Sequence, residues 1–259
     1  MIYLKTIVVI AILTSSPAFG QKSEPAALDI LEKAADLVDY RSISMKIVLT
    51  TSTPSGSVRI REIDSYSLSY NDVSKMLIRI TAPPDQRGVA MLIHDYRDKS
   101  DDMWIYLPAL RKSRRVVSSE KGSQFLGSEF LNSDMSRPAL KDFSHSMKGS
   151  SKIDNQECWI IESVALDENI ARENGCTKKI SYVTKKDTLC RKTEFYDSGS
   201  NLQRVQTISK FVKNGTNSYI ATSLDVLNNK SGRRSTIEIN PITGKAPLEN
   251  SHFDPLMLR

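Results

Sequence analysis

Hydrophobic and polar positions follow two different periods along this chain of 259 residues. Between residues 25 and 40, apolar residues recur at steps of three and four with Asp, Glu and Lys between them, which predicts an amphipathic helix with one face to bury. After this helix, apolar and polar residues alternate in short segments, as Val58 and Ile60 do with two arginines, and this period of two indicates β-strands.

The alternating segments predict about eleven strands. They span residues 45–51, 58–66, 76–81, 89–95 and 103–107 in a first set, and 157–166, 179–184, 191–196, 202–212, 218–227 and 235–239 in a second. Turn-forming residues separate them, and Asn214-Gly215 is a strong two-residue hairpin signal. The expected fold is mainly β (α+β), with an antiparallel sheet so large that it must curl, split into a sandwich or close into a barrel.

Residues 109–151, between the two sets of strands, show no clear period and are expected to be irregular. A connection of this length is usually functional or disordered. Disorder does not fit this one, because Phe125, Leu126, Phe130, Leu131 and Met135 fall within eleven residues. These side chains need an apolar surface to cover.

The first 20 residues have the pattern of a secretory signal peptide: a short positive start, an apolar run and a small-residue exit with Ala18 and Gly20. We expect cleavage before Gln21, leaving residues 21–259 as a single domain in the periplasm. The apolar run from Thr6 to Leu13 is far shorter than the roughly 20 residues of a membrane-spanning helix, so an uncleaved anchor is the weaker interpretation.

Composition says less about function than the hydrophobic pattern does. The formal net charge is +6, which suits an acidic surface such as anionic lipid, and export removes nucleic acid as a partner. Cys158, Cys176 and Cys190 would lie in an oxidising compartment, where one pair could close. Their spacing does not identify the pair.

Chemistry-bearing motifs are missing from the sequence. There is no GxSxG, HExxH, Walker or GxGxxG motif, and His94, His145 and His252 are scattered with no partner at ligand spacing. The sequence therefore predicts a protein that is not an enzyme, with no catalytic residue, no metal site and no cofactor.

Three short stretches, taken in their order along the chain, resemble the motifs of a known protein family. They are Arg87-Gly88 with Met91-Leu92, residues 104–115 (WIYLPALRKSRR) and residues 125–130 (FLGSEF). In this order they closely resemble the LolA-like outer-membrane lipoprotein-sorting family, and by order of elements the resemblance covers nearly all of residues 21–259. Relatives tend to continue from Gly-Ser with an Asp and an acidic, aromatic stretch, whereas this chain has Glu129 followed by Phe130.

The resemblance implies a half-open antiparallel barrel of about eleven strands around an apolar cavity, with helices and loops as a lid. It also implies lipid or lipoprotein acyl chains as cargo and a transporter of the RND type as partner. Residues expected to contact lipid in the cavity or lid are Ile78, Ile80, Met91, Ile93, Trp104, Tyr106, Phe125, Leu126, Phe130 and Leu131. Which strand faces line the cavity stays open, because a slip of one residue exchanges the faces. A filled core is the alternative for each residue.

A basic cluster follows the strand at residues 103–107. Its members could contact lipid phosphate, an acidic partner or only water, and they are Arg111, Lys112, Arg114 and Arg115. The favoured function is a periplasmic carrier that touches membranes only peripherally. The alternatives are a lipid sensor that signals through a protein partner, and an exported hydrolase with an unfamiliar site.

Overall fold

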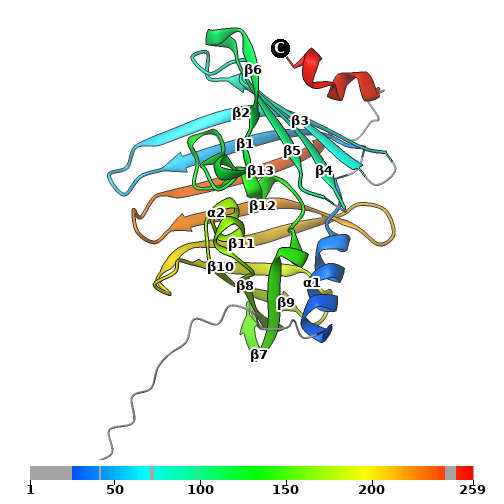
Figure 1. Ribbon diagram of the computed structural model, residues 1–259, viewed down its shortest axis with the longest axis vertical. Helices are drawn as coiled ribbons and strands as arrows, with labels where there is room; N and C mark the ends of the chain where they lie inside the picture. Colours follow the sequence, from blue (N-terminus) through cyan, green and yellow to red (C-terminus); the bar gives the residue numbers. More distant parts are fainter. Residues whose placement is uncertain (1–24, 41, 71–72, 98, 243–248, 259) are drawn as a thin grey trace, which may run out of the picture.

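The computed structural model describes residues 25–40, 42–70, 73–97, 99–242 and 249–258. The predicted signal peptide, residues 1–20, lies outside these ranges. Within them the chain forms two α-helices and thirteen strands, and all thirteen strands belong to one antiparallel sheet (Figure 1).

The sheet is a meander in which almost every strand pairs with its neighbours in sequence. Its order is β6-β5-β4-β3-β2-β1-β13-β12-β11-β10-β9-β8-β7, so the single long-range pairing joins β1 to β13. The strands are β1 (Ser44–Ser52), β2 (Val58–Tyr70), β3 (Val73–Ala82), β4 (Ala90–Tyr96), β5 (Asp102–Leu107), β6 (Lys112–Val116), β7 (Phe143–Ile153), β8 (Gln156–Ala165), β9 (Lys178–Thr184), β10 (Cys190–Tyr196), β11 (Leu202–Lys213), β12 (Tyr219–Asn228) and β13 (Arg234–Ile242).

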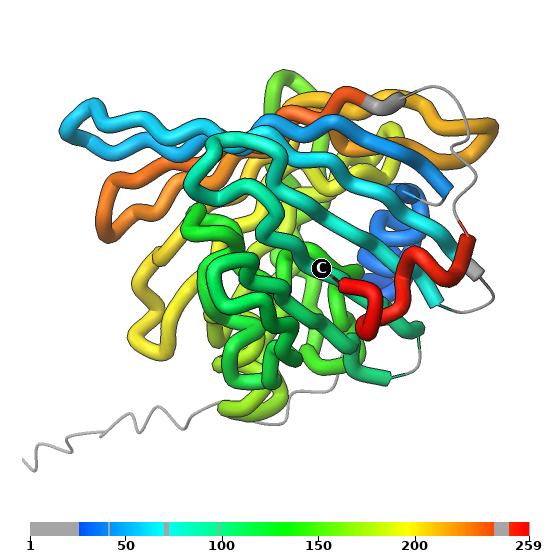
Figure 2. Tube along the Cα trace, turned by 90° about the horizontal axis from the view of Figure 1, so that it is seen from above, coloured from blue at the N-terminus to red at the C-terminus, as the bar shows by residue number. Residues whose placement is uncertain are grey.

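The sheet curls but stays open, because its two edge strands, β6 and β7, do not pair with each other. Figure 2 shows it curving around the green segment after β6 and around the first helix in blue. This helix, α1 (Pro25–Leu37), packs Ala27, Leu31 and Ala34 against Ile161 of β8 and Val183 of β9. The inside of the curl is therefore filled from two sources, α1 at one end and the connection between β6 and β7 at the other.

All eleven predicted strands are present, and the predicted helix is confirmed, but residues 109–151, which were expected to be irregular throughout, are so only between β6 and β7. That region contains the edge strands β6 and β7. Neither shows apolar alternation: β6 exposes residues 112–115 and buries only Val116, whereas β7 buries two serines and a histidine among its first four residues. Residues 214–218 do link a hairpin, but the loop is longer than the two residues Asn214-Gly215.

A second helix, α2 (Glu168–Asn174), was not predicted. It is short, and its signals are local rather than periodic. Asp167 caps its start by accepting hydrogen bonds from the N–H groups of Asn169 and Ile170, at 2.8 and 3.0 Å. Gly175 ends it at φ +63°, a left-handed conformation that glycine adopts without a side-chain penalty.

Candidate functional site: the covered inner face of the sheet

The concave face of the sheet is apolar from β6 to β12. Four residues predicted to contact lipid lie here side by side, Ile78 and Ile80 on β3 and Met91 and Ile93 on β4, each at most 4% exposed. The same cluster continues on the neighbouring strands through Met45, Leu49, Ile63, Met103, Val116, Val226, Ile237 and Ile239. We refer to this cluster as the inner face.

Trp104 and Tyr106, which were predicted to line the same cavity, lie on the opposite face of the sheet. They pack with Leu92 against Phe253 and Leu258 of the C-terminal segment, residues 249–258. The reason is the period of two: Met103 and Ile105 of β5 point to the inner face, so the residues between and after them point away. His94 on this outer side bonds through Nε2 to the carbonyl oxygen of Phe253 at 2.9 Å.

The connection between β6 and β7 closes the inner face. We call residues 117–142 the cover. Its Phe125 and Phe130 are 2% and 0% exposed within the inner-face cluster, and Leu126 packs against that cluster at partial exposure. Leu131, the remaining predicted contact, lies outside the cluster, with its side chain against Gly175 after α2. Side chains of the chain itself thus pack against the face that was predicted to line an apolar cavity.

A tight loop brings the two phenylalanines of the cover together. The N–H of Phe125 donates to the carbonyl oxygen of Phe130 at 2.8 Å, and Ser128 Oγ donates back to the carbonyl oxygen of Phe125 at 2.7 Å. Between them, Leu126 and Gly127 have φ of +50° and +71°. A left-handed leucine is unfavourable, so the surrounding contacts determine this conformation.

Glu129 attaches the cover to the hairpin of β12 and β13. Its carboxylate is 3% exposed and pairs with Arg233 at 3.0 Å. It also accepts a hydrogen bond from Asn228 Nδ2 at 2.7 Å, and the Glu129 N–H donates to Ser235 Oγ at 3.0 Å. The glutamate at which the sequence departs from the family pattern is therefore a buried anchor of the cover.

A second buried ion pair holds the other end of the cover. Asp134 receives both terminal nitrogens of Arg204 on β11, at 2.5 and 2.9 Å, with the two side chains 11% and 7% exposed. Asp134 also accepts the N–H of Leu131 at 2.8 Å, and the Arg204 guanidinium lies 3.8 Å from the ring centre of Phe195. Sequence analysis missed this pair because its members are 70 residues apart.

A third attachment involves a carboxyl group at the end of β4. Asp95 accepts the N–H of Arg137, in the cover, at 2.9 Å. Burial, together with the neighbouring negative charge of Asp101, raises the pKa of Asp95 to about 7. This contact is therefore sensitive to pH near neutrality.

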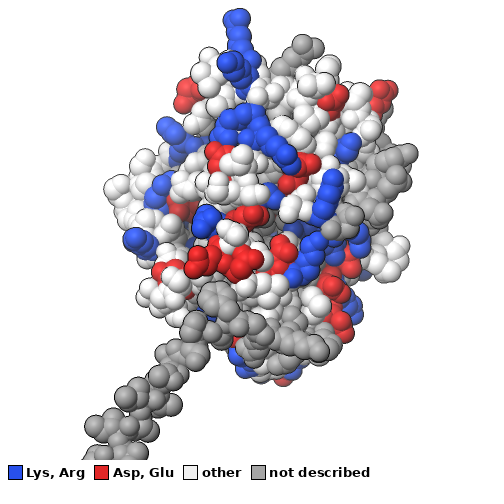
Figure 3. All heavy atoms as spheres, in the orientation of Figure 1, with Lys and Arg blue, Asp and Glu red and all other residues white. Residues whose placement is uncertain are grey.

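The predicted basic cluster lies on and beside the edge strand β6. All four of its residues are exposed, and Arg114 and Arg115 pair with Glu120 (2.6 Å) and Asp102 respectively. Arg111, at φ +48°, and Lys112 make no ion pair among the described residues. Figure 3 shows Lys and Arg side chains projecting from the top of the molecule, where β6 lies.

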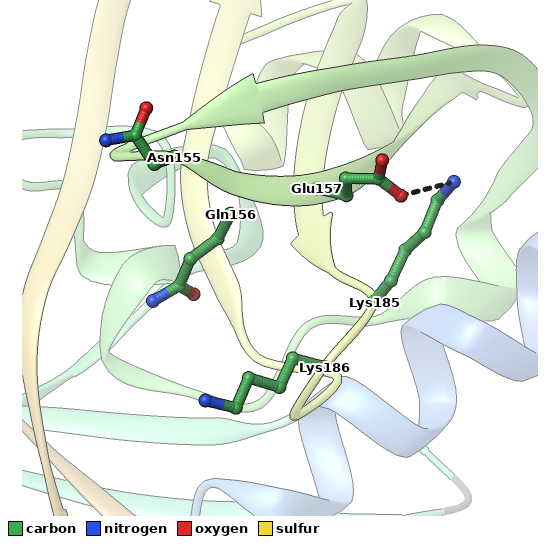
Figure 4. Close-up of a pocket in the computed structure, with 5 residues that line it drawn as sticks. All are labelled: Asn155, Gln156, Glu157, Lys185 and Lys186. Atoms are coloured by element: carbon green, nitrogen blue, oxygen red, sulfur yellow. Dashed lines mark ion pairs between the residues drawn. The ribbon is translucent and has the colours of Figure 1, made fainter.

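Two hollows among the described residues do not resemble a lipid site. One of about 480 Å³ is lined by polar side chains from two turns at the far end of the sheet (Figure 4), namely Asn155, Gln156, Glu157, Lys185 and Lys186. Glu157 and Lys185 form an ion pair there at 3.6 Å. The second, of about 20 Å³, is no larger than a water molecule.

The groups that could carry other chemistry are dispersed. In the part of the chain that the structure describes, no three His, Cys, Asp or Glu side chains gather at metal-binding distance. Cys158, Cys176 and Cys190 are free thiols, and burial raises the pKa of each. His94 and His145 are buried and bonded to carbonyl oxygens, and burial lowers the pKa of both.

Comparisons with known proteins agree on the fold. A family model described only as "Uncharacterized protein" matches residues 72–259. No curated protein matches the sequence. Among the described residues, no helix has the length and apolar character needed to cross a membrane.

Three solved structures share the architecture. An outer membrane lipoprotein-sorting protein domain from Vibrio parahaemolyticus is 24% identical, with a TM-score of 0.79 over 90% of this chain and 98% of its own. A DUF1329 family protein from Desulfovibrio piger is 23% identical, with a TM-score of 0.81 over 92% and 100%. A LolA superfamily protein from Nitrosomonas europaea is 22% identical, with a TM-score of 0.66 over 88% and 97%.

Proposed function

We propose that this chain, a member of the family whose model matches residues 72–259, is a non-enzymatic carrier of the LolA type that binds lipid or lipoprotein acyl chains on the inner face of its sheet. The observation that carries this proposal is the construction of the inner face. A continuous apolar surface spans eight strands, and a separate segment of the chain, the cover, closes it.

The cover is attached in a way that suits reversible opening. Its apolar contribution to the inner face rests mainly on Phe125 and Phe130, and its polar attachments are ion pairs and hydrogen bonds that include those of Glu129, Asp134 and Arg137. Water can replace polar partners at small net cost, whereas a bare apolar face needs a replacement for the phenylalanines. An acyl chain supplies it, at about 0.8 kcal/mol for each buried methylene before ordering costs.

We further propose that the protein works in the periplasm after loss of residues 1–20, with residues 21–259 as one domain. It would exchange cargo between membranes, or with an inner-membrane transporter of the RND type. The exposed cluster of Arg111, Lys112, Arg114 and Arg115 on an open sheet edge is suited to contact phosphate head groups or an acidic partner.

The test is native mass spectrometry with lipid extraction on the protein purified from its own periplasm. Two neighbouring residues provide a matched comparison: Met91 and Leu92 of β4 are each 1% exposed, but Met91 belongs to the inner face and Leu92 to the outer. Met91→Thr is expected to lower the bound lipid, and Leu92→Thr to leave it unchanged in the folded fraction.

An equal loss of bound lipid in both variants would mean that the lipid does not bind specifically to the inner face. A wild-type protein that is empty, and that also fails to take up a fluorescent fatty acid, would contradict the carrier proposal altogether. The inner face and the cover would then be a permanently closed core.

A further inference from the structure

Arg61 of β2 is a buried cation. Its side chain points to the concave side of the sheet, next to the inner-face residue Ile63, and the residue is 3% exposed. Its Nε donates to Gln86 Oε1 at 2.6 Å, but its Nη1 is buried with no hydrogen-bond partner. Among the described residues Arg61 forms no ion pair.

The surroundings of Arg61 contain more positive charge than buried negative charge. Burial is the main cause that lowers the pKa of Arg61. The positive charges of Arg59 and Arg233 lower it further, and the negative charge of Asp85 opposes them. The buried carboxylate nearby, Glu129, is already paired with Arg233. A buried guanidinium with an unused donor is costly, and buried groups in such surroundings cluster at functional sites.

The cover lies directly on this group. A side chain at Gly127 would place its first carbon 3.4 Å from Arg61 Nη2, and the carbonyl oxygen of Gly127 accepts a hydrogen bond from Arg233 Nη2 at 3.2 Å. Both guanidinium groups therefore meet the same glycine of the cover. Opening of the cover, as the proposed function requires, would free both groups together.

We infer that Arg61 and Arg233 form a binding site for a phosphate ester, the head group of an anionic lipid whose acyl chains lie on the inner face. The inference rests on the proposed carrier function and narrows its cargo. Two guanidinium groups can grip phosphate oxygens through paired N–H donors. Ile63, next to Arg61 on the same face of β2, begins the apolar surface, so head group and acyl chains would have adjoining sites.

The experiment compares ligands with the same acyl chains and different head groups. Dioctanoyl phosphatidylglycerol, dioctanoylglycerol and glycerol 3-phosphate are titrated into the protein lacking residues 1–20. The anionic lipid is expected to bind about tenfold more tightly than dioctanoylglycerol, the order of one charge-assisted hydrogen-bonded contact. Arg61→Met should erase that preference. Arg59→Met, an exposed arginine two residues earlier on the same strand face, should leave it within about threefold.

Stability without lipid provides an independent readout. If Arg61 is unpaired until a ligand binds, Arg61→Met should raise the urea midpoint of unfolding, because an apolar side chain replaces an unpaired buried charge. A structural role predicts the opposite. Arg61→Gln serves as a second variant should the methionine variant fail to fold.

The outcomes separate this inference from the carrier proposal. Equal affinity for dioctanoyl phosphatidylglycerol and dioctanoylglycerol would overturn the anion site and leave the carrier standing, whereas no binding of either would overturn both. Binding of glycerol 3-phosphate as tight as that of the lipid would support the anion site with a soluble phosphate ester as its ligand. A lower midpoint in both Arg61 variants, with the lipid preference unchanged, would make Arg61 purely structural.

Discussion

Replacing Asp134 with Asn removes the negative charge that holds Arg204 beneath the cover. The change leaves the shape of the side chain intact and keeps one oxygen to accept the N–H of Leu131. What it removes is the charge facing both terminal nitrogens of a guanidinium that is 7% exposed. Arg204 has no other carboxylate partner among the described residues, and its Nε is already without a hydrogen bond.

The expected cost follows from this burial. Removing one partner from a buried ion pair typically costs about 3–5 kcal/mol, because the remaining charge stays in a poor solvent. Lys179 makes the loss worse. The negative charge of Asp134 favours the charged form of Lys179, whereas the positive charge of Arg204 disfavours it. We expect Asp134→Asn to lower the free energy of unfolding by about 3 kcal/mol, the lower end of that range, because the asparagine oxygen keeps one hydrogen bond.

The assay is urea unfolding followed by tryptophan fluorescence, with the midpoint and slope compared between variants. The matched control is Asp64→Asn, which breaks an ion pair with Lys46 whose side chain is 60% exposed. That variant should cost less than about 1 kcal/mol. A double variant, Asp134→Leu with Arg204→Met, should recover most of the stability, because neither member of the pair is left as an unpaired charge.

Equal shifts of the urea midpoint in Asp134→Asn and Asp64→Asn would contradict a large cost for the unpaired Arg204. In that case the Arg204 guanidinium would be adequately solvated or held by its stacking on Phe195. A double variant less stable than Asp134→Asn would likewise contradict the expected cost of an unpaired buried charge.

Three further outcomes are expected. Phe130→Ala should cost about 3–5 kcal/mol in urea unfolding because the side chain is fully buried, whereas Val117→Ala, 54% exposed, should cost less than about 0.5 kcal/mol. The pKa of Asp95 is raised in the folded state, so the folded protein binds its proton more tightly. Stability from this group is complete below the unfolded pKa of about 4 and is lost as pH rises through about 7. Asp95→Asn should therefore gain stability relative to wild type between pH 5 and pH 8, and parallel midpoint curves would contradict this. Reversing Arg114 and Arg115 to Glu breaks only exposed ion pairs, so the double variant should fold with a midpoint near wild type and yet transfer less cargo to anionic vesicles; unchanged transfer would remove the cluster from the mechanism.

The strands that sequence analysis found are those with one buried face. Alternation reveals β1 or β13 because half of their residues must be apolar, and it fails for β6, whose residues 112–115 are all exposed. It fails also for β7, where Ser144, His145 and Ser146 are buried although they are polar, and the first two form hydrogen bonds to β8. Edge strands are therefore the strands that a prediction based on hydrophobic periodicity is most prone to miss.

The composition of the site was easier to predict than its geometry. Ile78, Met91 and Phe130 were recognisable as apolar candidates from sequence, but assigning Trp104 to the same surface required knowing which face of β5 is concave. That is decided by pairing across the sheet, where Leu92 stands opposite Trp104 and Met91 opposite Ile105. A period of two gives two faces and does not label them.

The polar attachments of the cover illustrate why the FLGSEF motif was informative before its role was visible. Its glycine takes a left-handed conformation, its serine closes the loop between two phenylalanines, and its glutamate reaches Asn228 and Arg233, about a hundred residues away. Each residue type is demanded by a different partner, so the combination is rare by chance. Under the proposed function, the polar and apolar contacts of the cover behave differently on opening. Water replaces the polar attachments, but the inner face vacated by Phe125 and Phe130 is stable only when cargo covers it. Opening and cargo uptake would then be one coupled equilibrium, with affinity reduced by the fraction of molecules whose cover is closed.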